Sequence, residues 1–264
     1  MYDIDSVLIA AVLLLLMALA IELGFRLGLR RKDSANEATK AQINSTQSSI
    51  LGILALLLAF TFSLSLQRFN TRSDAAVDEA NAIGTAYLRS QLLPVSLRQE
   101  ARSLLESYLD VRVQAGALSM VQQKDWLPLQ AKAASLQAAL WVQARKAAEI
   151  DPNPVTSGLF IDALNNLIDS FSKRDAAIKR HVPEAALFLL HGTLLIAGLI
   201  VGITCGVSGQ RPSLVNFAMV ALMVALVFVI LDLDRPRRGL ITVSDESLVD
   251  LQTSLKKPQP TGAI

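Results

Sequence analysis

Four apolar segments constrain this chain most, because each is long enough to cross a lipid bilayer as a helix. They cover residues 7–29, 50–66, 185–207 and 213–231. The hydrocarbon layer is about 30 Å thick, and a helix needs roughly 17–25 residues to cross it. Backbone polar groups cannot stay unpaired in lipid, so each segment is expected to be helical. The sequence therefore predicts an all-α membrane protein with four transmembrane helices.

The rest of the composition excludes several functional classes. The single Cys removes any disulfide framework, and two His cannot build a multi-histidine metal site. A net charge of +2 gives no reason to expect nucleic acid as a partner. The chain also lacks a phosphate-binding glycine loop, a nucleophile elbow and a dinucleotide fingerprint. We therefore expect no enzyme activity, no cofactor and no bound metal.

The long segment between the second and third apolar segments is predicted to be helical. Ala, Leu, Gln, Arg and Glu dominate it, and no stretch of alternating β-branched residues interrupts it. Breaks at Pro94 and at 151–154, together with a helix start at 126–128, divide it into further helices. We therefore expect a helical-bundle domain inserted between membrane helices two and three. The expected boundaries are 1–66 for two membrane helices and a basic loop, 67–184 for the bundle, 185–231 for two more membrane helices, and 232–264 for a charged motif and a flexible tail.

The charges that flank the first helix favour an N-terminus outside the cytoplasm. Asp3 and Asp5 precede this helix, and Arg30, Arg31 and Lys32 follow it. A basic flank tends to remain in the cytoplasm, which would place the helical domain outside the cytoplasm. Basic residues near the other helix ends are more numerous on the domain's side, and this favours the reverse orientation.

Small and polar residues share one face of the second apolar segment. At about 100° per residue, they form one stripe along the helix. Such a face either packs closely against another helix or lines a water-filled path at the axis of an oligomer. Its continuation beyond the apolar segment, through Asp74 and Asn81, favours the second alternative. The pore-lining candidates are Ser45, Ser49, Gly52, Ala59, Ser63, Gln67 and Asn70.

Two further features lie within the other apolar segments. Gly198, Gly202 and Gly206 are four residues apart and share one face, which predicts close helix packing. Glu22 and Arg26 are one turn apart near the end of the first helix. An ionisable pair inside a membrane suggests a function, but the acid-then-base order also suits a pair that neutralises itself.

Two charged motifs stand outside the apolar segments. After the fourth segment, Asp232, Asp234 and Arg235 precede a turn at Pro236 and Gly239. They form either an interfacial anchor or a charged ring at a pore mouth. The second motif covers 79–89 and contains Glu79, Asn81, Tyr87 and Arg89.

The order of these elements and the two motifs, 79–89 and 231–239, resemble the bacterial bestrophin-like membrane family. The chain departs from that pattern at Arg237, where relatives carry an aromatic residue, and it lacks a run of aromatic residues in the second segment. Bestrophins are pentameric anion channels, so the resemblance implies a homo-oligomer, pentameric by analogy, that conducts inorganic ions across the lipid bilayer. Ser49, Gly52, Ala59 and Ser63 would then face the pore axis. The alternative is a non-conducting sensor or scaffold whose helical domain binds a ligand or partner.

Overall fold

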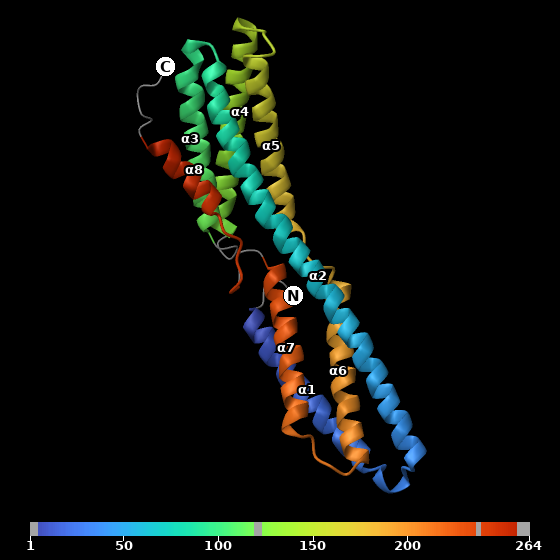
Figure 1. The fold of residues 1–264 in the computed structure, drawn as a ribbon. Coiled ribbons are helices and arrows are strands. Elements are labelled where there is room, and N and C mark those ends of the chain that lie inside the picture. Colours follow the sequence, from blue (N-terminus) through green and yellow to red (C-terminus); the bar gives the residue numbers. More distant parts are fainter. Residues whose placement is uncertain (1–4, 119–122, 236–238, 258–264) are drawn as a thin grey trace. The chain divides into compact units, whose positions relative to one another are not determined.

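The computed structural model describes residues 5–118, 123–235 and 239–257, with side chains at 123–125 excepted. Within these residues the fold is all-α, as predicted, with no strand (Figure 1). The helices are α1 (Ser6–Leu29), α2 (Glu37–Arg89), α3 (Val95–Ala117), α4 (Gln123–Ile150), α5 (Ser157–Lys179), α6 (Glu184–Val207), α7 (Leu214–Asp234) and α8 (Glu246–Lys256), with short 3₁₀ turns η1 (Lys32–Ser34) and η2 (Ser90–Leu92).

Four of the described helices are long and apolar enough to cross a membrane, in agreement with the sequence analysis. They are α1, α6, α7 and the apolar part of α2. The expected second segment, 50–66, forms part of one uninterrupted helix of 53 residues. Helix α4 begins at Gln123, three residues before the start expected at 126–128, and Pro128 lies near its beginning.

The described residues form two compact units. The membrane unit contains the described residues up to Arg68, then His181–Arg235 and Gly239–Ile241. The helical unit contains the described residues of Phe69–Arg180 and those from Thr242 onward. Helix α2 contributes residues to both units.

The membrane unit is apolar both inside and outside. Its core contains Leu13 and Met17 of α1, Leu190 of α6 and Val227 of α7, all buried. Large apolar side chains also point outward, such as Leu222 of α7, which is 64% exposed. A helix that is apolar on all sides is expected where lipid replaces water as the solvent. The chain is therefore a multi-pass membrane protein.

The helical unit has its own apolar core, which is formed by residues of α2, α3, α4, α5 and α8. Tyr108 and Phe160 are the largest of its fully buried side chains. Helix α8 adds the buried Leu248, with Leu251 and Leu255 packed at the edge. The sequence analysis assigned no helix to this part of the chain and expected a flexible tail. Of that expected tail, residues 258–264 lie outside the described residues.

Candidate functional site

The stripe of small and polar residues on α2 is exposed in the single chain. All seven candidates, Ser45, Ser49, Gly52, Ala59, Ser63, Gln67 and Asn70, are exposed. A Cβ added to Gly52 would meet no atom within 4 Å. The stripe continues along the same helix through Asp74 and Asn81, which are also exposed.

The opposite face of α2 packs into the membrane unit. Leu54, Leu58, Thr61 and Ser65 are buried, and about 100° per residue places them on the side away from the stripe. The Thr61 hydroxyl donates to the Leu57 carbonyl at 2.7 Å, so its polar group is satisfied within the helix. Packing inside one chain therefore uses the buried face, while the stripe residues stay exposed.

A large apolar side chain lies within the stripe between Gly52 and Ala59. Leu56 stands one helical turn from Gly52, and it is 56% exposed. The sequence analysis traced small and polar residues and therefore passed over it. If copies of α2 surround a common axis, Leu56 is the bulkiest apolar group of the stripe between Gly52 and Ala59.

Glycines bring α1 and α6 into close contact. A Cβ on Gly202 would lie 2.1 Å from the Ile21 carbonyl oxygen, and one on Gly206 would lie 2.3 Å from the Phe25 carbonyl oxygen. A Cβ on Gly24 of α1 would lie 2.0 Å from the Leu199 oxygen. Gly198 has more room, since its nearest neighbour is the Met17 side chain at 3.2 Å. Residues without side chains let the two backbones approach.

Glu22 and Arg26 form an ion pair on the outer surface of α1. The Arg26 Nε donates to Glu22 Oε1 at 2.7 Å. The Arg26 side chain is 72% exposed, and the Glu22 side chain is 52% exposed. They therefore neutralise each other at the edge of the apolar segment, where Arg26 can extend toward lipid headgroups.

The charged residues at the end of α7 are buried. The Asp232 carboxylate accepts hydrogen bonds from the backbone N–H groups of Leu240 at 2.9 Å and Ile241 at 2.8 Å. Gly239 lies against it, since an added Cβ would be 2.2 Å from Asp232 Oδ1. The Asp234 carboxylate accepts the Val182 N–H at 3.0 Å. Within the membrane unit, the Asp232 carboxylate thus connects the end of α7 to Leu240 and Ile241, and the Asp234 carboxylate connects it to Val182.

Arg235, beside these carboxylates, is only 4% exposed. A role of Asp232, Asp234 and Arg235 at a pore mouth stays a prediction. Pro236 and Arg237, which belong to the same motif, lie outside the described residues.

A buried ionic network lies at the centre of the helical unit. The Arg112 guanidinium donates to both oxygens of Glu79, at 2.5 and 3.2 Å. Arg174 also donates to Glu79 and reaches Asp245, the residue that precedes α8. Glu79, Arg112 and Arg174 are at most 4% exposed. The guanidinium of Arg112 also lies over the ring of Phe171 at 4.7 Å. The network thus joins α2, α3, α5 and the start of α8.

This environment shifts the pKa values of its members. Burial raises the pKa of the Glu79 carboxyl, but Arg112 and then Arg174 outweigh burial, so this pKa lies below its ordinary value. Burial lowers the pKa of Arg112, and its pairing with Glu79 reverses the direction and raises it. Burial, together with the nearby Glu79 charge, raises the pKa of Tyr108. Glu79 and Arg112 are therefore both charged at neutral pH.

Other residues of the 79–89 motif hold α2 to its neighbours. Arg89 donates to the Leu159 carbonyl at 3.0 Å and to Asp162 at 2.8 Å on α5. The Tyr87 hydroxyl donates to Glu106 of α3 at 3.1 Å. Asn81 belongs to the exposed stripe instead. The motif thus combines packing residues with one residue of the candidate conduction surface.

Sequence reasoning missed Arg112, Arg174 and Asp245. A signal exists for the two arginines, because each occupies a position at which the apolar face of its helix continues. Arg112 follows the buried Leu105 and Leu109 on α3 at helical spacing, and Arg174 follows Leu167 on α5. A basic residue in such a register requires a buried acidic partner.

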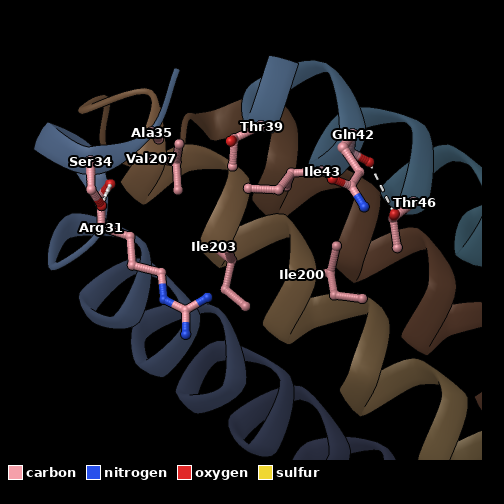
Figure 2. Close-up of a pocket in the computed structure, with 10 residues that line it drawn as sticks. All are labelled: Arg31, Ser34, Ala35, Thr39, Gln42, Ile43, Thr46, Ile200, Ile203 and Val207. Carbon is pink, nitrogen blue, oxygen red and sulfur yellow. Dashed lines mark hydrogen bonds between the residues drawn. The ribbon is translucent and has the colours of Figure 1, made fainter. Parts of the chain in front are cut away.

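A pocket of about 550 Å³ opens in the membrane unit where α1 ends and α2 begins. Figure 2 shows Arg31 extending from the end of α1, with Ile200 and Ile203 on the α6 side. Thr39, Gln42 and Thr46 line it from α2. The sequence analysis used Arg31 only to judge orientation.

No group of three or more His, Cys, Asp or Glu residues that could hold a metal ion occurs among the described residues. Cys205 accepts a hydrogen bond from the Asn216 amide at 3.3 Å. The candidate functional features of the described residues are therefore the ionic network around Glu79, the polar stripe of α2 and the pocket that contains Arg31.

These observations define a multi-pass, all-α membrane protein with a buried ionic network in its helical unit. A family profile described as a Bestrophin-like domain matches residues 8–248. The chain belongs to the bestrophin-like family, as its motifs indicated.

The crystal structure of a bacterial bestrophin homologue from Klebsiella pneumoniae, which carries one isoleucine-to-threonine mutation, is similar to this fold. The TM-score is 0.63 with 14% sequence identity, over 90% of this chain and 98% of that chain. At this identity the similarity concerns the fold. A search of curated proteins gave no match.

Proposed function

We propose that this protein is a homo-oligomeric ion channel of the bacterial inner membrane, with a conduction path lined by α2. The observation that carries the proposal is the division of α2 into two faces. One face is buried against the other membrane helices, and the opposite face carries Ser49, Gly52 and Ser63 to the surface. Hydroxyl groups and a glycine on an exposed membrane face suit water and ions better than lipid tails.

Membership of the bestrophin-like family supports the same proposal, since bestrophins form oligomeric channels. In an oligomer, several copies of α2 would surround one axis. In the helical domain, inserted between the second and third membrane helices, the same face of α2 continues through Asp74 and Asn81. By the charges that flank α1, this domain faces the periplasm.

The charge along the stripe predicts the kind of ion. Among the stripe residues named here, Asp74 is the acidic one, and it is exposed. The neighbouring Asp78 pairs with Lys173 at 2.6 Å and is thereby neutralised. A ring of acidic side chains attracts cations. We therefore expect a preference for cations over anions, in contrast to bestrophin anion channels.

The test is the current through purified protein in planar bilayers with a tenfold salt gradient. A conducting protein gives a reversal potential that follows the gradient of one ion. Silent bilayers that contain the assembled oligomer would contradict the proposal and favour the sensor or scaffold.

A further inference from the structure

The pocket between α1, α2 and α6 joins a cationic end to an apolar wall. Arg31 follows the end of α1, Thr39, Gln42 and Thr46 come from α2, and Ile200, Ile203 and Val207 come from α6 (Figure 2). Its volume of about 550 Å³ falls in the usual range for small-molecule sites, about 300–1,000 Å³. All of its lining residues belong to the membrane unit.

Arg31 is the principal free hydrogen-bond donor of this pocket. Its guanidinium has no ion pair or side-chain hydrogen bond with any residue that the structure describes. The nearby hydroxyls are already used, since Thr46 donates to the Gln42 carbonyl at 2.9 Å and Thr39 donates to Asn36 at 2.8 Å. A guanidinium presents its donors as a planar fork that matches a phosphate group.

The surroundings of Arg31 favour an anion. Arg30 and Lys32 flank it in the chain, with Asp33 as the adjacent acid. The next acid, Glu37, pairs with Lys40 at 2.9 Å. The segment that closes the pocket therefore carries an excess of positive charge.

The position of the pocket selects the kind of anion. It lies at the ends of α1 and α6, two helices that cross the membrane, so its mouth is at the level of lipid headgroups. A free phosphate would use the Arg31 side alone, whereas a phospholipid would also cover the isoleucines with its glycerol and first acyl carbons.

We propose that this pocket binds the phosphate of an anionic phospholipid, with Arg31 on the phosphate and the α6 isoleucines against the acyl chains. Basic pockets between membrane helices bind anionic headgroups in this way. The site depends on insertion of the membrane unit into a bilayer, and it is independent of conduction along α2.

The experiment measures lipid binding to the delipidated full chain in detergent by native mass spectrometry. The probes are phosphatidylglycerol, phosphatidylcholine with the same acyl chains, and inorganic phosphate. We expect phosphatidylglycerol to bind about tenfold more tightly than phosphatidylcholine. Arg31→Gln should abolish this preference, Arg31→Lys should retain part of it, and Arg145→Gln, at an exposed arginine of α4 in the helical unit, should leave it unchanged.

A second variant tests the apolar wall. Ile203→Ala should weaken the binding of phosphatidylglycerol and leave that of inorganic phosphate unchanged. Equal binding of the two lipids, or equal effects of Arg31→Gln and Arg145→Gln, would overturn the proposal. Inorganic phosphate that binds as tightly as phosphatidylglycerol would also overturn it, because the site would then hold a free anion.

Discussion

In the interior of the helical unit, the guanidinium of Arg112 on α3 donates hydrogen bonds to both carboxylate oxygens of Glu79 on α2, at 2.5 and 3.2 Å. Arg174 reaches the same carboxylate from α5. Two arginines on one buried glutamate leave an excess positive charge, which Asp245 offsets through Arg174. The network therefore depends on four chain segments at once.

Replacement of Glu79 should destabilise the helical unit strongly. Glu79→Gln leaves the Arg112 guanidinium buried without its counter-charge and leaves Arg174 with Asp245 as its acidic partner. Loss of one partner of a buried pair costs about 3–5 kcal/mol. Hydrogen exchange of α3 and α5 amides in the full chain measures this free energy. Asp162→Asn removes the exposed partner of Arg89 and should cost no more than about 1 kcal/mol. Equal losses in both variants would contradict a central role of Glu79.

The same network predicts a loss of stability in acid. The pKa of Glu79 is lower in the folded than in the unfolded chain, because Arg112 and Arg174 outweigh the effect of burial. The stabilisation is therefore complete above the ordinary pKa of about 4.3 and decreases as the pH falls through the lower, folded value. One such group changes the free energy of unfolding by at most about 1.4 kcal/mol per pH unit. Glu79→Gln should flatten this dependence, and an unchanged pH profile would assign it to other carboxylates.

Helix α6 offers a matched pair of glycines for testing its contact with α1. A Cβ on Gly202 would lie 2.1 Å from the Ile21 carbonyl oxygen, while one on Gly192 would meet nothing within 4 Å. Gly202→Ala should force the helices apart and cost about 1–3 kcal/mol. Gly192→Ala should be neutral or slightly stabilising, because alanine favours a helix by up to about 1 kcal/mol. Unfolding in mixed detergent micelles measures both, and similar effects would contradict close α1–α6 packing.

Asp74 should set the ion preference. Asp74→Asn removes the charge from the stripe of α2 and should move the reversal potential toward that of the anion. In a tenfold gradient of a monovalent salt, the reversal potential lies about 59 mV on one side of zero for a perfectly cation-selective channel and about 59 mV on the other side for a perfectly anion-selective one. Asp169→Asn, at an exposed aspartate of α5, is the control and should leave the reversal potential unchanged.

Much of the fold follows from the sequence, because length and hydropathy suffice for α1, α6 and α7. Helix α8 was not predicted because it is short and because its apolar contacts with the core of the helical unit come from Leu248, Leu251 and Leu255 alone. The apolar segment of α2 was predicted, and its face of small residues was visible at helical spacing.

The ionic network could not be assigned from the sequence. Its partners lie far apart in the chain, since Arg112 follows Glu79 by 33 positions and Asp245 follows Arg174 by 71. No feature of the sequence next to either residue of such a pair identifies its distant partner. The lipid pocket was missed for the same reason, since Arg31 and Ile203 meet only after α1 and α6 have packed.

The conduction path along α2 is tested most directly by adding bulk to the stripe and measuring current. Ser63→Leu places a large side chain at the centre of the exposed face, while Ala18→Leu does so on the exposed face of α1. In planar bilayers, with assembly checked by size-exclusion chromatography, we expect Ser63→Leu to abolish the current and Ala18→Leu to preserve it. Wild-type current in an assembled Ser63→Leu protein would contradict a path along α2.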